Sequence, residues 1–143
     1  MVNSKSIEKI SFEEAYYAFC KIIGISSDLD PSLSFKSRYP GVLESSVVQP
    51  FQQIGGKDLY PELLDKAAAI FYFCIKNHPL EDGNKRLALL LLFILLYKNG
   101  YWIKSNNDKL YNFTIEVASS KTEDIQDTFS YIKSFLEEHI YEN

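Results

Sequence analysis

The stretch that decides the fold is ELLDKAAAIFYFCIKNHPLEDGNKRLALLLLFILLYKNG, residues 62–100, in which two apolar segments flank nine mostly polar residues. Residues 62–77 carry apolar side chains almost all round a helical projection, which predicts a long central helix. Residues 85–99 predict a second helix that is buried on nearly all sides and ends at Gly100. Its apolar run, 87–97, is about half of what spans a bilayer, so we expect a core helix of a soluble domain.

A first helix is predicted upstream of this pair. Ser11 followed by Glu14 is a capping-box pattern, and residues 12–23 carry apolar side chains at helical intervals before Gly24. The following residues, 25–41, hold many Ser, Pro and Asp in irregular order and are expected to form a long surface loop.

The connection to the central helix is expected to be short and turn-rich. Residues 42–49 predict a short helix ended by Pro50, and residues 51–59 contain two adjacent glycines. Pro61 suits the first position of the central helix. A short β-hairpin between residues 35 and 60 stays open as an alternative.

Two more helices are predicted toward the C-terminus, over residues 108–118 and 125–140, the second capped by Thr122. Its apolar stripe has spacings of three and four and consists of Ile125, Phe129, Ile132, Leu136 and Ile140. No segment shows sustained period-two alternation and no repeat has a fixed period. We therefore expect one all-α, compact single domain over residues 1–143.

Composition narrows the class of protein. The 143 residues are 46% apolar and 24% charged, enough for a self-sufficient core. The net charge of −4 lacks the positive field that direct nucleic-acid or anionic-membrane binding needs, so neither partner is expected. Cys20 and Cys74 lie in apolar stretches and are predicted to be reduced core thiols. With no secretory signal pattern at the N-terminus, a cytoplasmic location is expected.

The polar segment HPLEDGNKR, residues 78–86, has the composition of an anion site. Gly83 allows a tight backbone path, which places the amides of Gly83, Asn84 and Lys85 at the N-terminus of the following helix. The peptide dipoles, Lys85 and Arg86 add positive potential, and Arg86 can hold phosphate oxygens in a bidentate way. These residues are candidates for binding a phosphate group.

Two further residues of this segment suggest phosphoryl transfer. Asp82 offers a hard oxygen ligand suited to magnesium, and His78 carries an imidazole, the side chain most often used as a general base. The plain alternative is that His78 caps one helix and Asp82 starts the next. A third interpretation makes them ligands of a metal hydrolase, although a catalytic zinc site usually needs three protein ligands.

The whole string resembles the signature of the Fic/Doc (Fido) superfamily: His, any residue, Phe, any residue, Asp or Glu, Gly, Asn, Gly or Lys, and Arg. Lys85 is similar to the Doc (death-on-curing) branch. The flanking sequence is similar to the Doc-like pattern from Gly41 to about Ile103, which makes residues 41–103 the core of the resemblance.

The resemblance implies a helical Fido fold, with a possible short β-hairpin flap, and transfer of a phosphate-containing group from a nucleotide to a Ser, Thr or Tyr hydroxyl of a target protein. The co-substrate would be ATP or another nucleoside triphosphate, with Mg²⁺. The implied roles are His78 as general base, Asp82 as magnesium ligand, Gly83 and Asn84 in the anion hole, and Lys85 and Arg86 on the phosphates.

Three positions refine this expectation. Leu80 replaces the Phe that anchors the loop, while Lys85 and Leu89 stand where AMP-transferring members carry Gly and Arg. In the Doc branch these last two departures accompany transfer of a terminal phosphate, with elongation factor Tu as a known kind of target and arrest of translation as the result. A toxin-type phosphotransferase is therefore expected; AMP transfer and a degenerate non-catalytic binding module are the alternatives.

Members of this family are usually held inactive by an antitoxin or by their own inhibitory helix. Ser134 and Glu138 have the spacing of the inhibitory motif, but His139 follows where Gly or Asn is required. A separate antitoxin is therefore the expected partner. The sequence offers no way to assign the contacts to the nucleotide base among its many aromatic residues.

Overall fold

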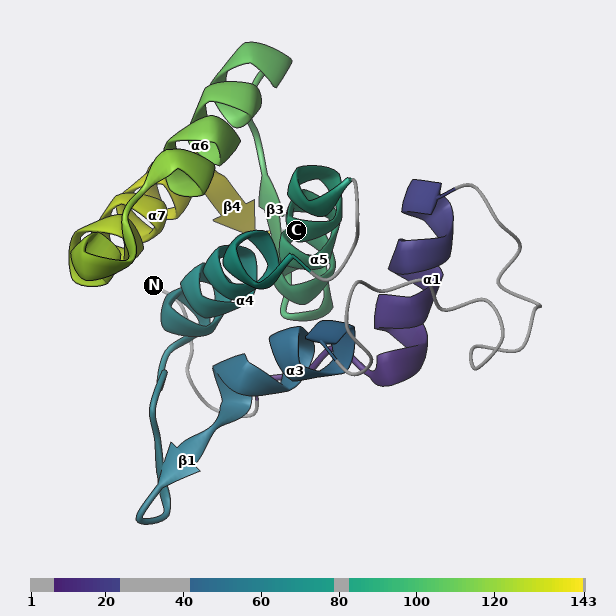
Figure 1. Ribbon diagram of the computed structural model, residues 1–143, viewed down its shortest axis with the longest axis vertical. Coiled ribbons are helices and arrows are strands. Elements are labelled where there is room, and N and C mark those ends of the chain that lie inside the picture. The colour runs from purple at the N-terminus through teal and green to yellow at the C-terminus, as the bar shows by residue number, and fades with distance from the viewer. Residues whose placement is uncertain (1–6, 24–41, 79–82, 143) are drawn as a thin grey trace.

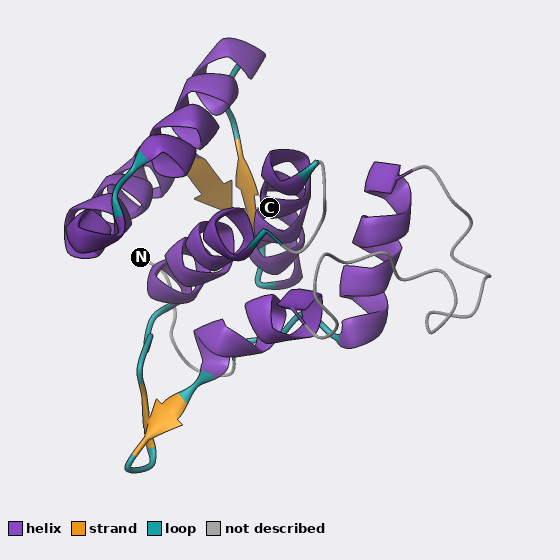
Figure 2. Ribbon diagram, in the orientation of Figure 1, coloured by secondary structure: helices purple, strands orange, loops and turns teal. Residues whose placement is uncertain are grey.

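A computed structural model describes residues 7–23, 42–78 and 83–142 of the chain. The described residues form six α-helices and two short strand pairs, as Figures 1 and 2 show. The helices are α1 (Phe12–Ile23), α3 (Val42–Val48), α4 (Leu63–Asn77), α5 (Asn84–Lys98), α6 (Asn107–Ser119) and α7 (Ile125–His139). The predicted helical fold is confirmed.

Helix α4 is the central element. In Figure 1 it lies between α6 and α7 on one side and α3 and α1 on the other, and it packs along α5. Its residues 67–71 are completely buried, and so are Leu87, Leu91 and Leu95 of α5, which follow each other at intervals of four. Burial of several such side chains, at about 1.5–3 kcal/mol each, makes this helix pair the rigid base for the segment that joins them.

The start of α1 confirms the predicted capping box. The Ser11 amide donates to Glu14 Oε1 at 2.8 Å, and the Glu14 amide donates to Ser11 Oγ at 3.1 Å. Lys98, at the end of α5, forms an ion pair with Glu14 at 2.7 Å. One carboxylate therefore both caps α1 and ties it to α5.

The start of α4 differs from the prediction by one position. Glu62 is the N-cap, its amide donates to the Asp65 carboxylate at 3.1 Å, and Pro61 lies just outside the helix. The prediction of Pro61 as the first helical residue was wrong because the Glu62–Asp65 pair completes a capping box that makes Leu63 the first residue of the helix.

The segment before α4 forms the hairpin that the sequence left as an alternative. A 3-10 turn, Gln49–Phe51, follows α3 and leads into the antiparallel strands β1 (Gln53–Ile54) and β2 (Lys57–Asp58). Gly55 and Gly56 lie between them, both with positive φ, as a tight two-residue turn requires. Figure 1 shows this hairpin projecting from the helical body.

A second strand pair was not predicted. Strand β3 (Tyr101–Ile103) follows α5 and pairs antiparallel with β4 (Ile140–Glu142) at the end of the chain, with Trp102 opposite Tyr141. Three residues are too few to show an alternating pattern in the sequence. The pairing places the end of α7 beside the residue that follows β3, where the Lys104 amide donates to the His139 carbonyl at 2.9 Å.

Aromatic stacking joins α4, α6 and α7. Phe113 of α6 stacks on Phe71 of α4 at 4.7 Å between centroids, and on Phe135 of α7 at 4.0 Å. Thr122, predicted as the cap of α7, instead begins the 3-10 turn Thr122–Asp124, and Asp124 is the N-cap of α7. The extra turn allows the chain to reverse between two closely packed helices.

Both cysteines are buried and free, as predicted. Burial in apolar surroundings raises the pKa of the Cys74 thiol far above its ordinary value, because the thiolate would lose its hydration. In the described parts of the chain, no helix combines the length and apolar character that a membrane crossing requires.

Candidate functional site

The motif begins at the C-terminus of α4 and ends in the first turn of α5. Gly83 is the N-cap of α5 and has φ of 86°, a left-handed conformation that a residue without Cβ adopts at little cost. The first hydrogen bond of the helix runs from the Leu87 amide to the Gly83 carbonyl at 2.9 Å. The amides of Lys85 and Arg86 precede that bond, so they belong to the turn whose donors are available to an anion.

His78 closes α4 in an uncommon conformation. It is the C-cap residue, with φ of 51° and ψ of 61°, and among the described non-glycine residues it alone has a positive φ. Its side chain is exposed. The capping interpretation is thus correct for the backbone of His78, while its imidazole stays accessible to a substrate.

A contact between side chains joins the two ends of the motif. Asn84 Nδ2 lies 3.4 Å from His78 Nδ1. Either side chain can be the donor in this contact, because Asn84 can present its NH₂ or its oxygen, while Nδ1 accepts when it is unprotonated and donates when it is protonated. In either orientation, Nε2 is the ring nitrogen that Asn84 does not engage.

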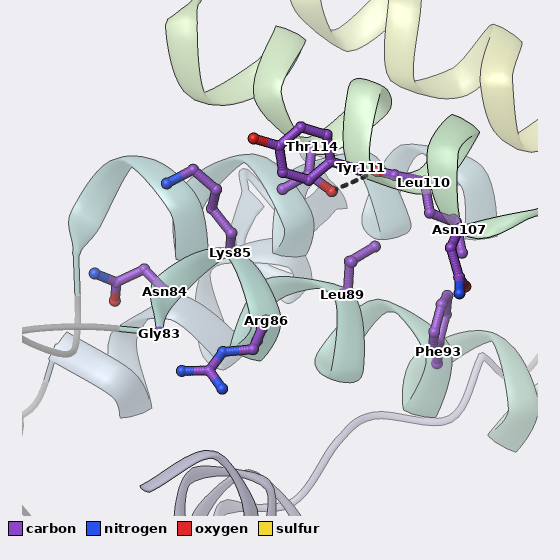
Figure 3. Close-up of a pocket in the computed structure, with 10 residues that line it drawn as sticks. All are labelled: Gly83, Asn84, Lys85, Arg86, Leu89, Phe93, Asn107, Leu110, Tyr111 and Thr114. Carbon is purple, nitrogen blue, oxygen red and sulfur yellow. Dashed lines mark hydrogen bonds between the residues drawn. The ribbon is translucent and has the colours of Figure 1, made fainter.

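The two cations of the motif are exposed and lie on different sides of α5. Figure 3 shows Lys85 on the side of α6 and Arg86 pointing away from α6. Together with the helix N-terminus between them, they surround the start of α5 with positive potential from two directions. This arrangement suits an elongated polyanion, which can contact both cations and the amides.

A groove of about 530 Å³ extends from the motif between α5 and α6. Its motif end is formed by residues 83–86, and its walls by Leu89 and Phe93 of α5 and by one face of α6. That face consists of Asn107, Leu110, Tyr111 and Thr114. Tyr111 is 65% exposed, and its ring lies along the groove on the same side of α5 as Lys85 (Figure 3).

None of the described residues that line the groove is acidic, and its cations lie at one end. The groove therefore offers an apolar, partly aromatic channel that leads to an anion-binding terminus. A ligand that fits it has a flat apolar part and a negatively charged end, since each part then meets a matching surface.

The structure brings together five of the predicted site residues: His78, Gly83, Asn84, Lys85 and Arg86. Asp82, predicted to bind magnesium, and Leu80, which replaces the family Phe, lie outside the described residues. Within the described ranges, no group of three or more His, Cys, Asp or Glu side chains could hold a metal ion.

The sequence analysis did not assign Phe93 or Tyr111 to the site. A usable signal was present for Tyr111, because Asn107, Leu110, Tyr111 and Thr114 have the spacing of one helix face. Nothing in the sequence indicated that this face lies beside the motif, because that depends on the packing of α6 against α4 and α5.

Comparisons with known proteins identify the family of the chain. Over 73 residues the chain is 40% identical to Toxin Doc from Mycolicibacterium smegmatis (strain ATCC 700084 / mc(2)155), covering 51% of this chain and 56% of that protein. The chain thus spans about half the length of this curated relative. No solved structure matches the chain. A model of the Fic/DOC family matches residues 7–96, well over half of the sequence, so the chain belongs to that family.

Proposed function

We propose that this protein transfers the terminal phosphate of ATP, or of another nucleoside triphosphate, to a hydroxyl side chain of a target protein, and that it acts as a toxin that inhibits translation. The observation that carries the proposal is the exposed imidazole of His78, held 3.4 Å from Asn84 in the first turn of α5. A proton acceptor and an anion-binding helix terminus thereby form one site. Similarity to a Doc toxin supports the biological role, with elongation factor Tu as a candidate target.

In the proposed step, the hydroxyl oxygen of the target attacks the γ-phosphorus in line with the bond to the β-phosphate oxygen. The new O–P bond forms as the old one breaks, ADP leaves, and His78 Nε2 takes the hydroxyl proton. This requires a proton on Nδ1, and the Asn84 side-chain oxygen can accept that Nδ1–H once the amide is turned. Asn84 would then hold the ring in the basic tautomer.

The phosphates would lie against the amides of the first turn of α5, between Lys85 and Arg86. Phosphoryl transfer needs positioning and charge stabilisation more than covalent help, so these fixed donors provide most of the catalysis. The nucleoside would lie in the groove between α5 and α6, with the base against Tyr111 and Phe93. Groove and terminus are contiguous, as one nucleotide requires.

Magnesium would be held by Asp82 together with phosphate oxygens, since this ion usually binds one or two carboxylates and keeps its remaining positions for water and substrate. When bound, it would neutralise charge on the phosphates and so favour the transfer.

Two positions favour phosphate over AMP transfer. Lys85 occupies the place of a Gly, and Leu89 that of an Arg, in the AMP-transferring members. Leu89 lies in the wall of the groove, where it contributes apolar surface and no charge. Compared with that pattern, the site has a cation in the first turn of α5, at Lys85, in place of one in the wall of the groove, at Leu89.

Intact-mass analysis tests the reaction. Candidate targets, beginning with elongation factor Tu, are incubated with the protein, ATP and Mg²⁺. Addition of one phosphate supports the proposal, and addition of one AMP favours the alternative transferase. Nucleotide binding without modification of any candidate or of proteins in a cell lysate would favour a non-catalytic binding module.

A further inference from the structure

The conformation of His78 needs an explanation beyond the motif. A left-handed backbone at a residue with a Cβ costs free energy, and it persists only where the surrounding structure enforces it. Since Pro79 follows, the alternative at His78 is extended backbone, which would turn the imidazole elsewhere. Whatever holds the last turn of α4 therefore also determines where the ring lies.

Lys76 holds that turn from one side. Its Nζ donates to the Ala118 carbonyl at 3.1 Å and to the Ser120 carbonyl at 2.5 Å, and it lies 5.9 Å from the centroid of the Tyr72 ring. Both carbonyls are at the C-terminus of α6, the negative end of that helix. Partial burial lowers the pKa of Lys76, in agreement with an ammonium withdrawn from water into this contact.

A second contact holds the same turn from another element. Asn77 Nδ2 lies 3.4 Å from Gln49 Oε1, at the start of the 3-10 turn that follows α3. This distance is at the long end of a hydrogen bond, whereas Lys76 makes two bonds with an ionised donor, which are the stronger kind. Lys76 is therefore the dominant anchor.

We propose that Lys76 is a positioning residue for His78: by fixing the last turn of α4 to the C-terminal carbonyls of α6, it keeps His78 left-handed and its ring beside Asn84. The consequence for catalysis rests on the proposed function of His78. The same anchor joins α4 to α6, the helix that forms one wall of the groove. It therefore also fixes the position of the His78 imidazole relative to the groove.

The structural part is tested by NMR, without any assay of activity. The chain has two histidines, His78 and His139, so their ring signals can be assigned and compared. In Lys76→Met, the His78 ring signals and its HN–Hα coupling, which reports φ, should change, while those of His139 keep their wild-type values. Lys76→Arg should restore the His78 signals, because a guanidinium also donates to two carbonyls.

Lys121→Met removes an exposed lysine close to the same carbonyls and serves as the control. Unchanged His78 signals in a folded Lys76→Met protein, or equal changes in Lys121→Met, would overturn the proposal. If Lys76→Met does not fold, Lys76→Gln, which is neutral and shorter, replaces it with the same expected results.

Kinetics then separate positioning from binding. In Lys76→Met, kcat should fall about tenfold or more with KM for ATP nearly constant, because a small displacement of a reacting group is costly to the chemical step. Lys76→Arg should recover most of kcat. A normal kcat together with displaced His78 signals would refute the catalytic consequence. If the wild-type protein modifies no target, the proposed function fails, and the NMR comparison still decides whether Lys76 positions His78.

Discussion

The side chains of Asn84 and His78 meet at 3.4 Å although they belong to different helices, α5 and α4. His78 ends one helix in a left-handed conformation, and Gly83, also left-handed, precedes the other. The two left-handed residues thus lie at the two ends of the connection between α4 and α5. They direct a basic ring and a helix N-terminus to the same place, which ordinary helical geometry at either position would not do.

Arg86 is expected to contribute through its shape as well as its charge. Arg86→Ala should lower kcat on the order of 100-fold or more, the usual cost of removing one fixed donor to transition-state charge. Arg86→Lys should recover only a small part of this loss, because an ammonium cannot hold two phosphate oxygens in parallel. Steady-state kinetics with saturating ATP measures both, and full activity of the lysine variant would contradict bidentate binding.

Tyr111 is expected to bind the nucleoside. Tyr111→Ala should raise KM for ATP about tenfold with kcat nearly unchanged, because base–aromatic stacking contributes about 1–3 kcal/mol. Tyr97, an equally accessible tyrosine of α5 outside the groove, provides the control, and Tyr97→Ala should leave KM at the wild-type value. Equal KM values for the two variants would place the base elsewhere.

Lys66 is expected to be important for stability and for the hairpin. It is only 2% exposed, and its Nζ donates to the Tyr60 carbonyl at 2.5 Å and to Asp58 of β2 at 3.1 Å. Lys66→Met should reduce the free energy of unfolding by about 1–3 kcal/mol, because the Tyr60 carbonyl and the Asp58 carboxylate lose their ionised donor. Denaturant unfolding measures the change.

Lys57→Met, which removes an exposed lysine from the same hairpin, should unfold like the wild type. Hydrogen exchange in residues 52–60 should become faster in Lys66→Met alone. Identical unfolding curves for the two variants would show that the buried ammonium makes no net contribution.

The ionisation of Glu14 is expected to make the stability of the folded protein depend on pH in the acidic range. Its partial burial by itself would raise its pKa, but the Lys98 ammonium and the hydrogen bonds from Ser11 outweigh this and lower the pKa below its ordinary value. A carboxyl group with a lowered folded-state pKa contributes stability that is present above its unfolded pKa and is lost as pH falls through the folded pKa.

Thermal unfolding between roughly pH 6 and pH 3 should therefore show a smaller loss of Tm in Glu14→Gln than in the wild type, the difference growing toward the acid end. Glu13→Gln, at the neighbouring exposed position, should follow the wild-type curve. Parallel curves for Glu14→Gln and wild type would contradict the assignment.

Where sequence patterns were strong, they predicted the fold well. The leucine-rich run of α5 and the all-round apolar surface of α4 identify both helices, and Ser11 with Glu14 marks the start of α1 to the residue. Boundaries shifted where a local contact decided the outcome, as with Glu62 and Asp65 at the start of α4. The β3–β4 pair was missed because its strands are short and far apart in sequence.

The candidate site also has a part that the sequence predicted and a part that it did not. Residues 83–86 are consecutive and lie at one helix N-terminus, so the motif alone was enough to predict that they lie together at one end of the groove. Tyr111 and Lys76 act through packing against other helices, and neither stands out in the sequence. The burial of Lys66 could not be predicted from the sequence either. A lysine within a helix is expected to be exposed, unless the structure shows carbonyls around its ammonium group.

The central claim is that His78 accepts the proton of the target hydroxyl during transfer of the terminal phosphate. The most direct measurement is incorporation of label from ATP labelled in its γ-phosphate into elongation factor Tu or another modified target, compared among wild type, His78→Ala and His139→Ala. We expect labelling by wild type and His139→Ala, and loss of at least about 100-fold in rate in a folded His78→Ala protein. Labelling by His78→Ala at the wild-type rate would contradict it.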